Sequence, residues 1–201
     1  MAEVTRTLWY DTSEGRARLE QSALLHRSEC LVVLGEAGMG KTTLLKSLGL
    51  SGGAQFRRAR DFINDDANNY RGENRVIVID ALDEVPARTD GDAVDAVLRQ
   101  LRFAGLPRFI LSCRVADWRG ATAREAISGQ YSVPPLEVHL EPFDEDQATA
   151  FLAARLGGVE KAHAVVRHFS ERGLTNDFLG NPQTLELIAR VGHDLPNTKS
   201  E

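Results

Sequence analysis

The chain has 201 residues, of which 42% are hydrophobic and 26% are charged, and its formal net charge is −5. This composition is typical of a folded globular protein with one core and room for an appended subdomain, and it excludes a largely disordered chain. The acidic balance argues against broad affinity for nucleic acid, because binding to phosphate backbones depends on positive charge.

Export and membrane signals are not expected. The sequence has no run of 18 apolar residues, and Glu3 and Asp11 replace the basic and apolar pattern of a signal peptide. Cys30 and Cys113 lie in apolar runs without C-x-x-C spacing, as buried thiols of a reducing compartment do. We therefore expect a cytoplasmic protein without membrane contact.

The first predicted elements lead to a glycine-rich loop. Residues 12–27 are charged with apolar points at Ala17, Leu24 and Leu25, which predicts a helix. The apolar run at 30–34 predicts a strand, and residues 41–50 predict a second helix.

The loop between this strand and helix matches a phosphate-binding motif. Residues 35–42 read Gly-Glu-Ala-Gly-Met-Gly-Lys-Thr, which fits G-x-x-x-x-G-K-[ST]. Its three glycines allow a turn with positive φ and bring backbone N–H groups close to phosphate oxygens, and the helix start adds unpaired N–H groups and a positive dipole end. Lys41 is expected at the β and γ phosphates, and Thr42 is expected to ligate Mg²⁺. The residues assigned to the nucleotide are Gly35, Glu36, Ala37, Gly38, Met39, Gly40, Lys41, Thr42 and Thr43.

A second motif carries three acids. Residues 76–84 read Val-Ile-Val-Ile-Asp-Ala-Leu-Asp-Glu, and the apolar part predicts a strand buried on both faces of a parallel sheet. Its carboxyl end lies where open α/β sheets bind ligands, so Asp80 is the expected outer-sphere partner of Mg²⁺. Asp83 and Glu84 are candidates to orient or deprotonate the attacking water. The alternative is that both acids cap the next segment and face solvent.

Strands and helices alternate through the middle of the chain. A short strand is predicted near residues 56–60, an irregular segment over 61–75, and an amphipathic helix over 92–104. Further strands are predicted at 108–113 and 136–141. Repeated strand and helix units of this length imply a parallel sheet covered on both faces.

Arg114 follows the strand at 108–113. Its charge and forked donors would respond to the loss of a γ phosphate, so it is a candidate sensor and catalytic residue. The alternative is a surface arginine paired with Asp117 or Glu125. Ser112, in the same strand, is a weaker candidate.

The pattern becomes helical after Glu141. Apolar positions predict a helix after Asp144 and two more at 159–171 and 182–191. We therefore predict a nucleotide-binding domain over 1–142 and a small helical lid over 143–201. Pro182 suits the first turn of the last helix, a role that needs no ligand.

The ordered motifs resemble the NACHT group of STAND ATPases, the signalling relatives of AAA+ proteins. The motifs are the acidic one at 78–84, Ser112-Cys113-Arg114, Leu140-Glu141-Pro142-Phe143 and Gly180-Asn181-Pro182-Gln183-Thr184-Leu185, and the resemblance covers about residues 28–191. It implies a five-stranded parallel sheet in the order 5-1-4-3-2 and an ATP or ADP switch. It also implies the roles given above for Lys41, Thr42, Asp80, Asp83, Glu84 and Arg114, and places Pro182 against the adenine.

Two features depart from the resemblance. Relatives usually carry an effector domain before this module and a winged helix with a repeat sensor after it, and we expect neither within these 201 residues. The winged-helix histidine that contacts the nucleotide therefore has no counterpart.

These observations predict a slow ATPase that acts as a switch. ATP and Mg²⁺ would hold the sheet domain and the lid in one arrangement, self-association would follow in the ATP state, and in bacteria the resemblance implies antiphage defence. Two other functions stay open. One is an AAA+-like ATPase that remodels protein or nucleic acid by continuous hydrolysis, and the other is a module that holds ADP as a structural ligand.

Overall fold

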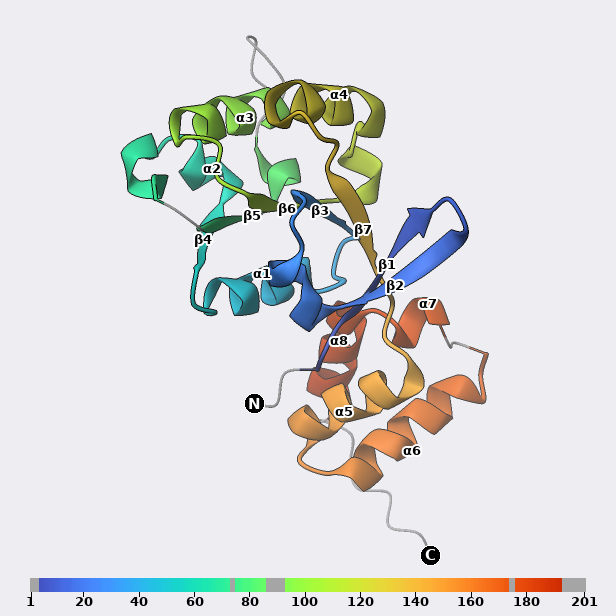
Figure 1. The fold of residues 1–201 in the computed structure, drawn as a ribbon. Coiled ribbons are helices and arrows are strands. Elements are labelled where there is room, and N and C mark those ends of the chain that lie inside the picture. Colours follow the sequence, from blue (N-terminus) through green and yellow to red (C-terminus); the bar gives the residue numbers. More distant parts are fainter. Residues whose placement is uncertain (1–3, 73–74, 86–92, 174–175, 193–201) are drawn as a thin grey trace, which may run out of the picture. The chain divides into compact units, whose positions relative to one another are not determined.

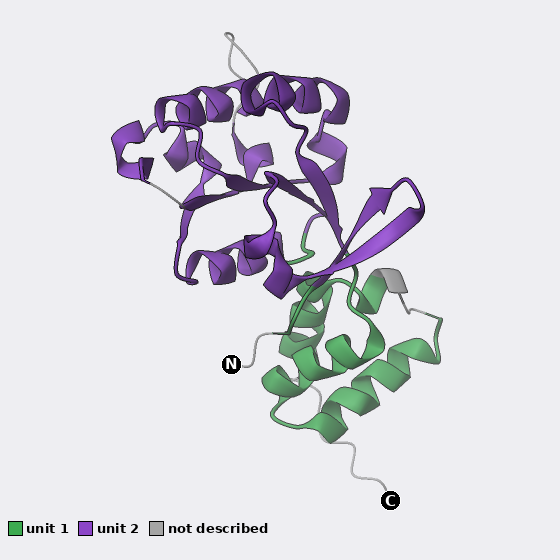
Figure 2. Ribbon diagram, in the orientation of Figure 1, with its two compact units in different colours: residues 1–6, 38–40, 141–201 green, residues 7–37, 41–140 purple. Residues whose placement is uncertain are grey.

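The computed structural model describes residues 4–72, 75–85, 93–173 and 176–192 (Figure 1). Parts of the predicted irregular segment at 61–75, the predicted helix at 92–104 and the predicted lid at 143–201 lie outside these ranges. The chain forms two compact units (Figure 2). Unit 1 comprises residues 1–6, 38–40 and 141–201, and unit 2 comprises residues 7–37 and 41–140.

Unit 2 is built on a mixed sheet of seven strands in the order β2-β1-β7-β3-β6-β5-β4. The neighbouring strands from β7 to β4 pair in parallel, whereas β1 pairs antiparallel with both β2 and β7. The predicted number of five strands is therefore wrong. Numbered along the chain among themselves, the parallel strands alone lie in the order 5-1-4-3-2. The strands are β1 Thr7–Thr12, β2 Gly15–Glu20, β3 Leu31–Leu34, β4 Ala54–Arg58, β5 Val76–Asp80, β6 Phe109–Cys113 and β7 Leu136–Leu140.

The two additional strands form a hairpin where a helix was predicted. The prediction of a helix over 12–27 is wrong, because this segment contains β2 and the 3₁₀ helix η1, Gln21–His26. Thr12 closes the turn, since its Oγ1 donates to the Gly15 carbonyl (2.8 Å) and accepts from the Glu14 N–H (3.2 Å). Leu8 and Leu19 are paired across the hairpin and both are buried. This cross-strand apolar pair stabilises the two strands.

Helices cover both faces of the parallel strands (Figure 1). Helix α1, Lys41–Gly49, lies on one face, and α3, Ala93–Phe103, lies with α4, Gly120–Tyr131, on the other. The short α2, Ala59–Phe62, begins within the strand predicted at 56–60 and runs into the segment predicted to be irregular, which also contains the 3₁₀ helix η2, Ala67–Tyr70. Every residue of β3, β5 and β6 is buried, as expected for strands covered on both sides. These three strands therefore form a rigid base for the residues at their carboxyl ends.

Unit 1 has a separate apolar core of helices. They are α5 Glu145–Leu156, α6 Val159–Ser170, α7 Asn176–Leu179 and α8 Pro182–Gly192. Asp144 and Gln147 form a capping box at the start of α5, and Phe143, Leu152, Val166 and Leu185 are among the buried core residues. No helix within the described residues is long and apolar enough to cross a membrane.

Candidate phosphate-binding site

The glycines of the predicted loop have two different roles. Gly38 and Gly40 have φ values of 77° and 86°, in the left-handed region that favours glycine. Gly35 does not have a positive φ, so the prediction of a positive φ at this position is wrong. Gly35 is instead constrained by space, because a Cβ atom at this position would lie 3.3 Å from the Leu140 Cβ.

Lys41 is folded back onto the beginning of the loop. Its Nζ donates to the carbonyl oxygens of Gly35 (2.6 Å) and Glu36 (3.0 Å). Burial lowers the pKa of the Lys41 ammonium, and the carboxylate of Asp83 acts in the opposite direction. The side chain is therefore a partly desolvated cation held by neutral carbonyls, which is a suitable environment for binding an anion.

The start of α1 supplies further donors. The helix begins at Lys41, and its first turn contains no acidic residue that would compete with an anion. Thr42 is half-buried and Thr43 is exposed in this turn. The first N–H groups of a helix have no partner within the helix, so this turn provides unpaired donors next to the loop.

A buried hydrogen bond fixes the Asp80 carboxylate. Asp80 is 2% exposed at the end of β5, and its Oδ1 accepts from the hydroxyl of the fully buried Ser112 on β6 (2.7 Å). The Ser112 Oγ in turn accepts from the N–H of Ala81 (2.9 Å). Ser112 thus joins the ends of two neighbouring strands and orients the acid, a role that sequence reasoning missed. The available signal was a hydroxyl within the apolar strand 109–113.

Ala81 turns the chain immediately after Asp80. It has φ 61° and ψ 55°, a left-handed conformation that is costly for a residue with a Cβ atom. The turn leads into the 3₁₀ helix η3, Leu82–Glu84, whose Leu82 is buried in the core. The two acids that follow Leu82 have different surroundings, because the Asp83 side chain is nearly buried and Glu84 is exposed.

Asp83 pairs with Arg114. The Arg114 Nε lies 2.8 Å from the Asp83 Oδ2, and the Asp83 side chain is only 6% exposed. Asp83, rather than the alternatives Asp117 and Glu125, is therefore the ion partner of Arg114. Asp83 and Arg114 also act electrostatically on Lys41, so the structure brings these three predicted residues together.

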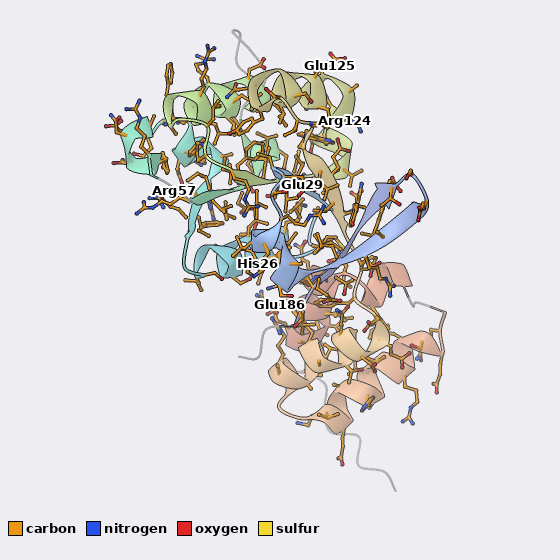
Figure 3. The ribbon with its side chains drawn as sticks, in the orientation of Figure 1. His26, Glu29, Arg57, Arg124, Glu125 and Glu186 are labelled. Atoms are coloured by element: carbon orange, nitrogen blue, oxygen red, sulfur yellow. The ribbon has the colours of Figure 1, made fainter. Side chains whose placement is uncertain are left out.

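Glu84 is outside this ion pair. It is exposed and lines a surface hollow of about 620 Å³ together with Arg57 and Arg60. Arg57 lies on β4, at the edge of the sheet (Figure 3). Its Nε donates to the hydroxyl of the buried Tyr70 (3.1 Å), which in turn donates to Asp65.

Within unit 1, the start of α8 packs on Gly38–Gly40. The Gln183 N–H donates to the Gly38 carbonyl (3.2 Å), and Asn181 caps the same N–H through its Oδ1 (2.9 Å). A Cβ atom on Gly38 would lie only 2.4 Å from the Gln183 Oε1. Pro182 is the first residue of α8, and its Cγ would lie 3.8 Å from a Cβ atom on Gly40. The motif at 180–185 therefore holds the central part of the loop.

The residues present fit a Mg²⁺ ion that is bound together with phosphates. No group of three or more His, Cys, Asp or Glu residues in the described part of the chain could hold a metal ion alone. Mg²⁺ commonly keeps several waters and takes one or two protein oxygens plus substrate phosphates. The Thr42 hydroxyl and the preoriented Asp80 carboxylate are donors of this kind.

Several solved structures are similar to this chain, and the first one named below shows that its α/β fold is similar to that of AAA+ P-loop ATPase domains. One is the replication initiator DnaA bound to AMPPCP and single-stranded DNA, with a TM-score of 0.55, 15% identity, and coverage of 85% of this chain and 57% of that chain. Another is domain III of the Thermotoga maritima replication initiation protein DnaA, with a TM-score of 0.45, 15% identity, and coverage of 82% and 85% respectively. A third comes from work on katanin self-assembly, with a TM-score of 0.44, 14% identity, and coverage of 65% and 46%. No protein-family model and no curated protein sequence matches the chain.

Proposed function

We propose that the chain binds ATP with Mg²⁺ and hydrolyses it. The observation that carries this proposal is the order of the central strands, in which β6 lies between β3 and β5. The phosphate loop follows β3, Asp80 ends β5, and Arg114 follows β6. Parallel strands end at the same edge, so anion donors, a buried carboxylate and a cation gather at one edge of the sheet.

Each residue has a role in this proposal. Lys41 and the loop N–H groups bind the β and γ phosphates, while Thr42 and, through water, Asp80 hold the metal. Mg²⁺ would neutralise phosphate charge and orient the phosphates for in-line attack. Because Asp83 forms an ion pair with Arg114, we assign the orientation of the attacking water to the other acid of the motif, Glu84.

We further propose that hydrolysis works as a switch of the NACHT and STAND type. The loop residues are divided between the two compact units, with Gly38–Gly40 in unit 1 and the flanking residues in unit 2. Loss of the γ phosphate would remove contacts of Lys41 and Arg114 and change the relative stability of two conformations. In this scheme Pro182 contacts the adenine, and the ATP form self-associates and signals through effector and sensor domains on the same or another chain. Antiphage defence is one output that fits.

Continuous remodelling is the competing function. A remodeller of this class would be favoured by an arginine that acts on the nucleotide of a neighbouring copy. Arg124 is one candidate, but it is engaged within the chain by Glu137 (3.4 Å) and the Gly120 carbonyl (3.1 Å). The acidic net charge does not exclude nucleic acid, because a similar fold occurs in DnaA bound to single-stranded DNA. Steady-state hydrolysis measured with and without single-stranded DNA separates the two functions: a switch turns over slowly and purifies with nucleotide, whereas a remodeller turns over many times per minute and responds to its substrate.

Two substitutions test the site itself. Lys41→Ala should abolish ATP binding in calorimetry, whereas Lys46→Ala, at an exposed position of the same helix, should leave it unchanged. Glu84→Gln should retain ATP and slow hydrolysis by about a hundredfold. If Lys41→Ala binds ATP as tightly as the parent, the assignment of the loop is wrong.

A further inference from the structure

A second cluster of cations lies at the other edge of the sheet. Arg71, Arg75 and Arg108 line one surface hollow of about 750 Å³. Arg75 directly precedes β5 and Arg108 directly precedes β6, so the hollow lies at the amino ends of these strands. The candidate phosphate-binding residues lie at the carboxyl ends of the same strands, so the two sites are distinct.

Arg108 is fixed by main-chain carbonyls. Its Nη2 donates to the Leu25 carbonyl (2.7 Å), and its Nη1 lies 3.5 Å from the carbonyl oxygens of both Leu24 and Glu29. Burial lowers the pKa of this guanidinium, so its charge is incompletely solvated. A partly desolvated cation with neutral partners gains from an anion that binds beside it.

The other two arginines complete the cluster. Arg71 donates from Nε (3.2 Å) and Nη2 (3.1 Å) to the Phe103 carbonyl, which leaves the Nη1 edge of its planar group for another acceptor. The Arg75 side chain is exposed and runs beside Gly72, where its Cδ would lie 3.8 Å from an added Cβ atom. Two of the three guanidinium groups are therefore held in place before any ligand binds.

The described lining of this hollow is positively charged. None of its described lining residues is acidic, and apolar side chains such as Leu25 and Leu106 form other parts of the wall. The carboxylate of Glu29 acts electrostatically on Arg108, but Glu29 forms an ion pair with Arg27 at 2.5 Å. The charge of the described lining residues is therefore positive although the chain as a whole is acidic.

We propose that this hollow binds a small phosphorylated ligand, whose phosphoryl group is held by Arg71, Arg75 and Arg108. Guanidinium groups match phosphate oxygens through paired, forked hydrogen bonds. The volume is in the range of small-molecule sites, and Leu25 and Leu106 can contact the apolar part of such a ligand. A compact hollow suits a single phosphorylated molecule, whereas a nucleic-acid backbone is better matched by an extended basic stripe. This proposal is independent of ATP hydrolysis at the loop.

Inorganic pyrophosphate is the probe, and the full chain with Lys41→Ala is the background, because this substitution disables the proposed loop site. Calorimetry at low salt should detect binding in this background. Adding Arg75→Gln should weaken binding about tenfold, which corresponds to the loss of one charge-assisted contact. Arg99→Ala, which removes an equal charge from an exposed position of α3 outside the hollow, should leave binding unchanged.

Arg108→Lys and a single-stranded oligonucleotide complete the test. The lysine keeps the charge and loses the fork, so it should also weaken pyrophosphate binding, provided that circular dichroism shows an unchanged fold. The proposal is overturned if the Lys41→Ala protein does not bind pyrophosphate, or if Arg75→Gln has no more effect than Arg99→Ala. It is also overturned if Arg75→Gln weakens binding of the oligonucleotide but not of pyrophosphate, since the surface would then recognise a polymer.

Discussion

Arg114 and Asp83 tie the end of β6 to the turn that follows β5. The Nε to Oδ2 distance of 2.8 Å is that of a charge-assisted hydrogen bond, and the Asp83 carboxylate is nearly buried while the Arg114 side chain is 48% exposed. A carboxylate in this position depends on its cation, whereas the cation retains access to solvent. In the proposed function, Arg114 contacts a phosphate while Asp83 holds the arginine in place.

Removal of this cation should affect ATP more than ADP. Arg114→Ala should weaken ATP binding about tenfold with little change for ADP, because only ATP has a γ phosphate to contact. The free energy of unfolding should fall by about 1 kcal/mol, since the pair is partly exposed. Calorimetry with both nucleotides measures the first effect and urea denaturation the second. Arg119→Ala, at an exposed position on the same connection, is the matched control, and equal losses for ATP and ADP would contradict a γ-phosphate contact.

Ser112→Ala should disturb Asp80 without touching a ligand. The substitution leaves the Asp80 carboxylate and the Ala81 N–H without their shared partner, both at a buried position. The expected cost is about 1–3 kcal/mol in the free energy of unfolding, measured by urea denaturation. Mg²⁺-dependent ATP binding should weaken as well. Ser22→Ala, at an exposed position, should change neither quantity. A fully stable Ser112→Ala protein would show that the hydrogen bond contributes little.

Gly38 and Gly157 form a matched pair for testing the loop. Both have a left-handed backbone, with φ values of 77° and 73°, but an added Cβ atom meets Gln183 and Asn181 at Gly38 and nothing within 4 Å at Gly157. Gly157→Ala should therefore cost only the backbone strain of about 1–2 kcal/mol. Gly38→Ala should cost more and should impair ATP binding. Thermal denaturation compares the stability of the two variants. Equal losses of stability would mean that Gln183 and Asn181 can move away from the added methyl group without a further loss.

Both thiols should be protected in the folded protein. Burial raises the pKa of Cys30, and burial together with the nearby charges of Asp83 and Asp117 raises the pKa of Cys113 to about 12 from its ordinary value of 9.0. Native protein at pH 8 should therefore react very slowly with a thiol reagent and quickly once unfolded. Because the folded state favours the protonated thiol, its stabilising contribution is complete below pH 9 and is lost as the pH rises towards 12. Rapid labelling of native protein would contradict this, and Cys30→Ala would identify the reactive thiol.

The sequence predicted the parts of the site that depend on local spacing. The positions of the glycine-rich loop after β3, of Asp80 at the end of β5 and of Arg114 after β6 were predicted correctly, because each follows an apolar strand directly. Their roles stay predictions. The Asp83–Arg114 pair and the Ser112–Asp80 hydrogen bond were not predicted, since each joins residues about thirty positions apart on different strands or turns. Such pairings depend on how side chains meet across neighbouring strands, which local spacing does not specify.

The β1–β2 hairpin was missed for a related reason. Ala17, Leu24 and Leu25 have the spacing of an amphipathic helix, and only the pairing of Leu19 with Leu8 shows that residues 15–20 form a strand. Pairing with β1 therefore determines the structure of this segment, and the helix-like spacing of its apolar residues does not. The helices of unit 1 were easier to predict because their apolar periodicity and the Asp144 capping box are both local.

The hairpin also determines what the outer margin of the sheet presents to other molecules. β2 is the last strand in the sheet order, and its sequence, Gly-Arg-Ala-Arg-Leu-Glu, has a charged residue at every second position. Charged outer strands discourage the backbone of another chain from pairing with them, which protects a protein from aggregation through its sheets. Assembly of several copies would then avoid backbone pairing along β2.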